Sequence, residues 1–316
     1  LHRPHPGRQR LRMSTHAARR SPWGPLHVND AHVHFFSHRF FTGLIAQKPG
    51  LTLDAAQKTL GWELPPEDPE LLALRWIEEL DRHGIQSASI IASLPGDEVS
   101  VLTAAKHHPD RLLPLAMVNP RAQQFTEAHA GLRAACLFPA MHLYSIHDDC
   151  VRPVFEWAQR EKRAVFVHCG VLSVGVRKKL GLASPFDLRY SNPTDLHAVA
   201  TRFPDVPIIV PHFGAGYFRE ALMLAELCPN VYLDTSSSND WMRFQTPPMQ
   251  MRDVFRQALD ILGPSRLLFG TDSSFFPRGW NHPVFDAQTT ALYELGVNAH
   301  DARAIFGENL LRILNR

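Results

Sequence analysis

The sequence predicts a (β/α)8 barrel of the TIM-barrel class, and three observations support this fold. Short apolar runs, eight in all, alternate with amphipathic stretches of helical spacing. The runs are nearly continuous in Val, Ile, Leu and Phe, as strands buried on both faces of a parallel sheet are. The 316 residues are enough for such a barrel, which typically takes roughly 250. A doubly wound open sheet would also alternate, but it usually has fewer strands, and the sequence holds neither G-x-G-x-x-G nor G-x-x-x-x-G-K-[ST].

The expected strands begin at residue 27, and all of them are short. They are His27–Phe36, Ser87–Ser93, Leu112–Asn119, Leu137–Tyr144, Ala164–Cys169, Val206–His212, Val231–Thr235 and Arg266–Asp272. The expected helices between them are Glu70–His83, Glu98–His108, Phe125–Ala135, Val151–Lys162, Asp195–Phe203, Tyr217–Leu227 and Arg252–Leu262, with a helical tail at Asp301–Leu314. Asn192-Pro193-Thr194 is a start signal for the fifth helix, and Gly263-Pro264 is a stop signal for the seventh.

Two long insertions interrupt the alternation, at Thr42–Leu72 and Gly170–Asn192. They follow the first and fifth strands, so both are expected at the carboxyl-terminal face of the barrel, where active-site loops lie. The barrel domain is expected to span residues 26–316. Residues 1–25 are expected to be a disordered basic leader, since six arginines precede the first acidic residue and no apolar stretch of a secretory signal is present. Met13 is a candidate start of translation, and Leu1 as part of the natural chain is the alternative.

Charge and cysteine content exclude several classes of protein. Without the six arginines of the leader, acidic residues outnumber Lys and Arg by 31 to 27, which argues against a nucleic-acid partner. No run approaches the roughly 18 apolar residues of a membrane span. The four cysteines form no C-x-x-C pair, so they are expected to be free thiols in a cytoplasmic protein.

The strongest chemical signal is Asp30-Ala31-His32-Val33-His34 at the end of the first strand. Side chains two residues apart on a strand point to the same side, so both histidines are expected to project into the barrel. Imidazole nitrogens suit zinc, manganese or iron.

Three further strands also end in a residue that can bind a metal. His168 closes the fifth apolar run, His212 the sixth and Asp272 the eighth. Such a group at the end of an apolar strand costs desolvation free energy unless it is paired. Four strands that all end in His or Asp at one barrel mouth predict a metal site, and we expect one divalent ion, zinc first, with manganese or iron as alternatives.

These motifs resemble the amidohydrolase superfamily. D-x-H-x-H on strand one, His after strand five, Pro-His-Phe-Gly after strand six and Gly-Thr-Asp after strand eight carry the resemblance, which covers residues 27–316. The sequences His108-Pro109-Asp110-Arg111 and Phe306-Gly307-Glu308-Asn309-Leu310 add support. Within the superfamily the chain is similar to the branch that contains aminocarboxymuconate semialdehyde decarboxylase.

The resemblance implies that His32, His34, His168 and Asp272 are metal ligands. It implies that His212 is the acid/base or water-orienting residue. Some relatives hold a second metal on a carboxylated lysine of strand four, but all six lysines of this chain lie outside the expected strands, so one metal is predicted. His142, on the expected strand four, is a candidate extra ligand or substrate donor; a hydrogen bond within a loop is an equal alternative.

The implied reaction is hydrolysis of an amide, ester or lactone of a small molecule by metal-activated water, with Asp272 moving the proton. The same site would serve a nonoxidative decarboxylase, which needs a cation for the carboxylate; Arg278 and Arg189 are candidates, and a surface position is the alternative for each. Four aromatic residues on expected mouth loops are candidates to wall an aromatic or conjugated substrate: Phe35, Phe36, Trp241 and Trp280. The alternative is that they pack the loops.

A third hypothesis is a catalytically silent barrel that acts as a binding module. The serine runs at 236–238 and 273–274 lack the G-x-S-x-G elbow of a serine nucleophile. Asp30 and Asp234 are expected to support the ligands or cap strand ends. The expected partner is a small-molecule substrate, with no nucleic acid and no membrane; a homodimer is a further expectation, because relatives are often dimers.

Overall fold

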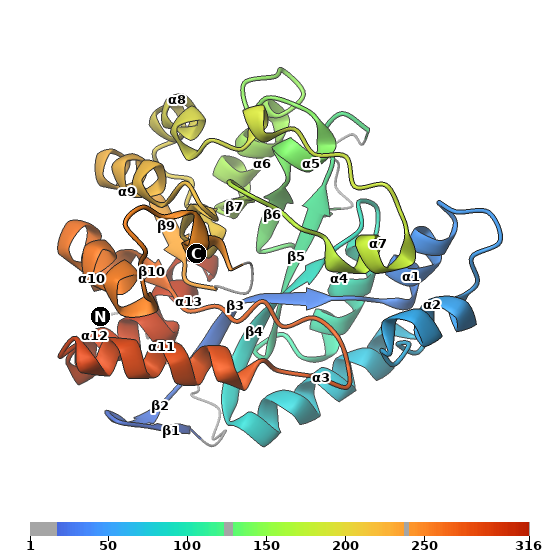
Figure 1. Ribbon diagram of the computed structural model, residues 1–316, viewed down its shortest axis with the longest axis horizontal. Helices are drawn as coiled ribbons and strands as arrows, with labels where there is room; N and C mark the ends of the chain where they lie inside the picture. The colour runs from blue at the N-terminus through green and yellow to red at the C-terminus, as the bar shows by residue number, and fades with distance from the viewer. Residues whose placement is uncertain (1–17, 123–128, 237–239, 316) are drawn as a thin grey trace, which may run out of the picture.

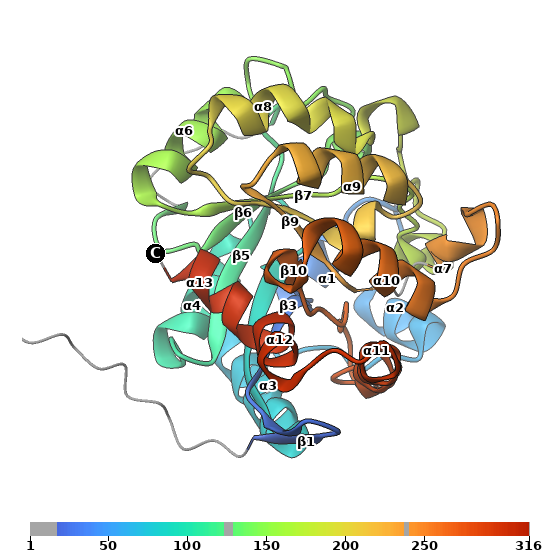
Figure 2. The same ribbon diagram turned by 90° about the vertical axis from the view of Figure 1, so that its left-hand side faces the viewer.

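The computed structural model describes residues 18–122, 129–236 and 240–315. Eight parallel strands form one sheet in chain order, and helices surround it, so the predicted (β/α)8 barrel is confirmed (Figures 1 and 2). The strands are β3 (Val28–Phe35), β4 (Ile85–Ala92), β5 (Leu112–Val118), β6 (Ala134–Leu137), β7 (Ala164–Val167), β8 (Ile208–Val210), β9 (Val231–Asp234) and β10 (Leu267–Leu268).

Hydrogen bonds between β3 and the segment after β10 close the barrel. Ala31 N donates to Phe269 O at 2.8 Å, Asp272 N donates to His32 O at 2.9 Å, and His34 N donates to Ser273 O at 2.7 Å. The last strand is thus joined to the first by backbone bonds that run through the residues expected to bind the metal.

Most of the expected helices form at the expected positions. The helices that follow strands are α3 (Pro69–His83), α4 (Glu98–His107), α6 (Arg152–Glu161), α8 (His197–Arg202), α9 (Phe218–Leu227), α10 (Met251–Leu262) and α11 (His282–Glu294). Shorter helices are α1 (His38–Ile45), α2 (Leu53–Leu60), α5 (Pro139–His142), α7 (Gly175–Leu180), α12 (Ala299–Arg303) and α13 (Asn309–Leu314). Within the described residues, none of them is both long and apolar enough to cross a bilayer.

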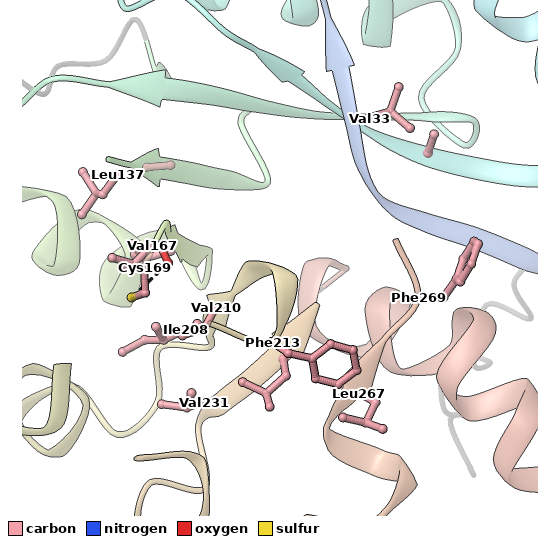
Figure 3. Packing of buried hydrophobic residues seen from close by; sticks show 14 of the residues in the cluster. Val33, Leu137, Val167, Cys169, Ile208, Val210, Phe213, Val231, Leu267 and Phe269 are labelled. Carbon is pink, nitrogen blue, oxygen red and sulfur yellow. Dashed lines mark hydrogen bonds between the residues drawn. The ribbon is translucent and has the colours of Figure 1, made fainter. Parts of the chain in front are cut away.

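The apolar residues of the strands form two layers. Outward-facing side chains such as Val33, Ile208 and Val231 pack under the helices (Figure 3). A second cluster fills the barrel, and three residues of α13 join it: Leu310, Ile313 and Leu314. Alternation along each strand therefore leaves the inner positions at the strand ends for the site.

The fourth strand differs from its expected position. It spans Ala134–Leu137 instead of Leu137–Tyr144, because Pro139 cannot continue the ladder and begins α5. His142 is therefore on a helical turn, not on a strand. The helix expected at Phe125–Ala135 is wrong at its end, which lies in β6, and residues 125–128 lie outside the described part of the chain.

Part of the expected disordered leader is folded. Residues Arg19–Ser21 (β1) and Gly24–Leu26 (β2) form an antiparallel hairpin. Trp23 Nε1 donates to Val297 O at 2.6 Å, and Arg19 Nη1 donates to His83 O at 2.8 Å. These bonds fix the hairpin to the barrel, so the expectation of disorder fails over residues 19–25. Residues 1–17, with Met13, lie outside the described part of the chain.

The two insertions pack against each other at the carboxyl-terminal face. The helices α1 and α2 from the first insertion and its flank, and α7 from the second, share a separate apolar cluster, which we call the cap (Figure 1). Its core includes Phe41, Leu60 and Val176. Lys48 Nζ donates to Leu180 O at 3.0 Å and joins the two insertions. The cap thus has a core of its own, distinct from that of the barrel.

Candidate metal centre

Three side chains meet at the mouth of the barrel. His32 and His34 come from the carboxyl end of β3, and Asp272 follows β10. The two Nε2 atoms lie 3.4 Å apart, and Asp272 Oδ1 lies 3.1 Å from His34 Nε2 and 3.7 Å from His32 Nε2. In the part of the chain that the structure describes, these three residues form a group whose ligand atoms could share one metal ion.

Hydrogen bonds to the other ring nitrogen orient each histidine. His32 Nδ1 lies 2.6 Å from Asp234 Oδ2, and a carboxylate only accepts, so Nδ1 carries the proton. His34 Nδ1 lies 2.7 Å from Ser93 Oγ, whose own hydrogen is donated to a backbone carbonyl. In their neutral forms both rings therefore turn the Nε2 lone pair toward Asp272, which places three acceptors together.

The electrostatic field of this cluster favours a cation. Burial alone would lower the pKa of His32, but the carboxylates of Asp234 and Asp272 outweigh it and raise this pKa to about 9. Burial would raise the pKa of Asp272, but the hydrogen bond with His34 and the charge of His32 hold it well below its usual range. The field that favours a proton on His32 also favours a divalent ion among the three ligand atoms. Two imidazole nitrogens and a carboxylate oxygen suit zinc, manganese or iron.

Two further histidines stand beside this cluster. The His168 side chain is buried after β7, 5.4 Å between ring centroids from His212, and its Nε2 has no hydrogen-bond partner among the described residues. His212 Nδ1 lies 3.1 Å from Ser236 O and donates to it, so its Nε2 is the basic nitrogen. Burial, together with the neighbouring histidines, lowers the pKa of His168, and burial with His32 lowers that of His212. Both rings are therefore neutral.

The backbone at the site is held in sparsely populated conformations. Asp272 has φ +55° and His212 has φ +55°, in the left-handed region that residues with a Cβ rarely adopt. At Gly270 there is no room for a side chain, because an added Cβ would overlap the Asp234 carboxylate and lie 3.1 Å from His32 Cβ. Strain of this kind persists where the surrounding structure enforces it, and it concentrates at functional sites.

Asp30 ties the barrel closure together. Its Oδ1 accepts from His32 N at 2.9 Å and from Thr271 N at 3.1 Å, and its Oδ2 accepts from Trp280 Nε1 at 2.8 Å. Burial raises the pKa of Asp30 to about 6 despite these bonds. Asp30 thus holds the backbone of His32, and Asp234 holds its ring.

A cavity of about 540 Å³ opens from the cluster toward the cap. His32, His34, His168, His212 and Asp272 line its barrel end, and residues of α1 and α7, with Trp62 after α2, line its other end. Its walls include Phe36, Trp62, Phe138 and Phe275. This is the geometry of a site for a small organic molecule beside a bound ion.

The comparisons with known proteins decide the family. The family model described as amidohydrolase matches residues 30–316. The chain belongs to the amidohydrolase family. A curated relative, protein fluG of Emericella nidulans, is 37% identical over 95 residues, which cover 29% of this chain and 10% of that protein.

Solved structures of low sequence identity share the fold. An uncharacterised TIM-barrel protein from Bordetella bronchiseptica is 20% identical, with a TM-score of 0.60 over 92% of this chain and 99% of its own. The 5-carboxyvanillate decarboxylase of Sphingomonas paucimobilis is 13% identical, with a TM-score of 0.59 over 92% of this chain and 99% of its own. An amidohydrolase from Burkholderia multivorans with bound zinc is 18% identical, with a TM-score of 0.58 over 91% of this chain and 99% of its own.

Several of the residues expected at the site line the cavity, and others do not. His142 and Arg278 line it, as does Phe36. Burial lowers the pKa of His142 to about 4, so its ring is neutral, and its buried Nδ1 lacks a partner among the described residues. Arg278 Nη2 lies 3.1 Å from Asp272 O.

Four expected residues lie elsewhere, which corrects their assignment to substrate. Arg189 is exposed and pairs with Asp187 at 2.6 Å. Trp241 is buried against Phe213 and Phe218 in the core under the helices. Trp280 is buried, and its Nε1 donates to Asp30 Oδ2. Phe35 packs in the core between the strands and the helices. Each of these side chains has a structural partner that the sequence did not reveal. Of the serine run, Ser236 binds His212, and 237–238 lie outside the described residues.

Sequence reasoning missed four residues of the site. Ser93 ends an apolar strand, as the predicted ligands do, so the same signal was available for it. Trp62, Arg177 and Lys179 come from the insertions, whose course depends on how the cap packs, and nothing in their spacing indicates the cavity.

Proposed function

We propose that this chain is a metal-dependent hydrolase that acts on an amide, ester or lactone of a small molecule. The observation that carries the proposal is the convergence of His32 Nε2, His34 Nε2 and Asp272 Oδ1 at one end of an aromatic-walled cavity. Solved structures similar to this chain include a probable 2-pyrone-4,6-dicarboxylic acid hydrolase. Another is an amidohydrolase with bound zinc.

We assign the metal to His32, His34 and Asp272, with His168 as a further ligand. The orphaned Nε2 of His168 is the second sign of a missing cation, since a buried imidazole nitrogen without a partner is costly. When bound, a zinc, manganese or iron ion supplies Lewis-acid polarisation of a carbonyl and acidifies water near neutral pH.

The proton chemistry belongs to His212 and Asp272. His212 donates Nδ1–H to Ser236 O, which leaves the Nε2 lone pair as the acceptor, and its lowered pKa keeps the ring neutral before the reaction. Asp272 stays ionised because its pKa is depressed, so it begins the cycle as an acceptor and passes a proton to the leaving group. His142, neutral and on the cavity wall, is positioned to hydrogen-bond the substrate.

A nonoxidative decarboxylase is the second candidate. The observation in its favour is Arg278, whose guanidinium lies beside Asp272 O and Ser274 Oγ at the cavity wall, where it would hold a substrate carboxylate. Similar structures include decarboxylases of aromatic acids. In this reaction Asp272, which is ionised at rest, would first take a proton from water and then deliver it to the carbon that loses CO₂.

Metal content and turnover test the proposal together. We expect elemental analysis to find close to one zinc or manganese per chain in the wild type and a large loss in Asp272→Ala. His212→Asn should keep the metal and lose activity by about 10²- to 10⁴-fold, because it removes a proton-transfer group. A panel of lactones, esters and amides, assayed beside unsaturated and aromatic acids for CO₂ release, separates the two reactions.

Two outcomes would refute the proposal. Absence of metal in the wild type after incubation with zinc would remove the basis of the site. Metal binding without turnover on either panel would support the silent binding module instead.

A further inference from the structure

The amino-terminal hairpin reaches a loop that supports the candidate metal centre. The hairpin, β1 with β2, precedes the stretch that the amidohydrolase model matches, which begins at residue 30, and it lies beside α3 and α11 (Figure 1). The guanidinium carbon of Arg19, the first residue of β1, lies 5.0 Å from the ring centroid of Trp280 and 4.4 Å from that of Phe285. Arg19 Nη1 donates to His83 O at 2.8 Å, and Asp286 Oδ1 lies 3.5 Å from Nη2. The hairpin is therefore fixed against the Trp280 ring.

The indole nitrogen of Trp280 binds a buried carboxylate. The Trp280 side chain is 1% exposed, and its Nε1 donates to Asp30 Oδ2 at 2.8 Å. Asp30 accepts three more bonds, from His32 N, from Thr271 N and from Thr271 Oγ1. A carboxylate has about four lone-pair positions, so these four donors satisfy it. Of the four, Trp280 is the donor that comes from the loop before α11.

Further bonds fix the loop that carries Trp280. Trp280 N donates to Glu79 Oε1 of α3 at 2.9 Å, and the Glu79 side chain is buried. At Gly279, whose φ is +66°, an added Cβ would overlap this carboxylate. Asn281 N donates to Ser273 Oγ at 2.8 Å. The loop is thus bound to α3 on one side and to the segment that closes the barrel on the other.

The bonds of Asp30 connect the two segments that carry the metal ligands. His32 N belongs to β3, which carries both histidines, and Thr271 N belongs to the segment after β10 that carries Asp272. One carboxylate therefore sets the distance between these segments, whose ligand atoms lie 3.1 to 3.7 Å apart. Metal ions accept ligand distances only within about 0.2 Å of their preferred values, so a small displacement of Asp30 is expected to weaken metal binding.

We propose that Trp280 is a positioning residue of the metal centre and that the amino-terminal hairpin acts through Arg19 as a strap that keeps Trp280 in place. Trp280 does not line the cavity, so it acts through Asp30 and not on a substrate. The inference rests on the proposed function for the presence of the metal. It assigns to residues ahead of the matched barrel a part in holding the ligand-bearing segments in place.

The zinc affinity of the full chain, measured by competition with a chromophoric chelator, tests the role of Trp280. Trp280→Phe keeps an aromatic ring and removes the Nε1 donor. We expect the affinity to fall by about 10-fold, at the lower end of the effect of outer partners of metal ligands. Trp241→Phe is the matched control and should leave the affinity unchanged. Its ring is equally buried, and its Nε1 has no hydrogen-bond partner among the described residues.

Two neighbouring arginines test the strap in the same assay. Arg19→Gln should weaken zinc binding by about 2- to 5-fold, which is the effect of one cation–π contact. Arg20 is the next residue of β1 and is exposed, so Arg20→Gln makes the same change in net charge and should leave the affinity unchanged. Circular dichroism checks that all four variants are folded.

Hydrogen exchange of the metal-free chain gives a readout that needs no ion. In Trp280→Phe we expect faster exchange at His32 N and Thr271 N, the two amides that donate to Asp30. Exchange in β7, across the barrel from β3, should stay as in the wild type. A general loss of stability would instead raise exchange in both strands, because the most protected amides of a domain exchange by global unfolding.

Three results would overturn the role of Trp280: wild-type zinc affinity in Trp280→Phe, an equal loss of affinity in Trp241→Phe, or exchange that rises equally in β3 and β7. Equal zinc affinities of the Arg19 and Arg20 variants would overturn the strap. A wild-type chain that binds no zinc would refute the proposed function, and the exchange of the metal-free chain would still decide whether Trp280 holds the ligand-bearing segments.

Discussion

At the scale of single residues, the site depends on which nitrogen of each histidine holds the proton. Asp234 accepts from His32 Nδ1 and Ser93 accepts from His34 Nδ1, so the Nε2 atoms are the available ligands. Such outer partners fix the tautomer and the ring orientation of metal-binding histidines. The chemistry of the cluster therefore extends to residues that touch no ion.

Asp234→Asn tests this dependence. The change keeps the shape and removes the negative charge that holds His32, so we expect zinc affinity to fall by about 10- to 100-fold. Competition with a chromophoric chelator measures the change. Asp260→Asn, an exposed carboxylate on α10, is the control and should leave the affinity as it is. An Asp234→Asn variant with wild-type affinity would show that the His32–Asp234 bond is only structural.

The sequence alone predicted this group of side chains better than it predicted the cavity. His32 and His34 lie near the end of β3, and His168, His212 and Asp272 follow other apolar strands. The topology of a parallel barrel brings such positions to one mouth. The residues of the cavity wall were harder to predict, because several of them come from insertions whose sequence has no helical or strand periodicity. Trp241 and Arg189 are an aromatic residue and a cation on expected mouth loops, as several residues that line the cavity are. Only the tertiary packing shows that Trp241 is buried in the core and that Arg189 is exposed.

At the scale of elements, the end of β10 brings two strands close enough to exclude any side chain. Gly270 lies against the Asp234 carboxylate and His32 Cβ, so the pairing of β3 with the segment after β10 and the positions of Asp234 and His32 are set together. This is why the Gly-Thr-Asp sequence begins with glycine: a larger residue would separate the strands that carry the cluster.

Gly270→Ala is expected to lower the free energy of unfolding by about 1–3 kcal/mol, because the added methyl group overpacks a buried site. Gly175→Ala is the matched control, since no atom lies within 4 Å of its added Cβ at the start of α7. Removing a glycine there should be neutral or stabilise by up to about 1 kcal/mol. Urea unfolding of both variants measures the difference; equal effects would contradict the packing argument.

Element positions were predictable where helical or strand periods run long enough. The helices α3, α4, α6, α9 and α10 form where expected, whereas the fourth strand was displaced. Its sequence, Ala-Ala-Cys-Leu, is short and lacks β-branched residues, and the residues after it fold as α5 once Pro139 ends the strand. The hairpin at Arg19–Leu26 was missed because its anchors, His83 O and Val297 O, are far away in sequence.

At the scale of the whole molecule, the metal cluster and the closure of the barrel are one structure. The backbone bonds that join β3 to the segment after β10 pass through His32, His34 and Asp272. An ion bound there would hold together the first and last strands of the barrel. Metal binding is thus expected to stabilise the entire fold and not only the loops around the site.

Zinc at about 100 times its dissociation constant should stabilise the folded chain by up to about 2.7 kcal/mol, because the ion binds the native arrangement of the ligands far more tightly than the unfolded chain. For a domain of this size we expect a rise in Tm of about 4 °C, measured by calorimetry with and without zinc. His32→Ala removes one of 18 histidines, so weak binding to the unfolded chain stays nearly the same while the native site is lost. The variant should therefore show almost no rise in Tm. A full rise in His32→Ala would place the stabilising ion elsewhere, and the coupling between metal and barrel closure would not hold.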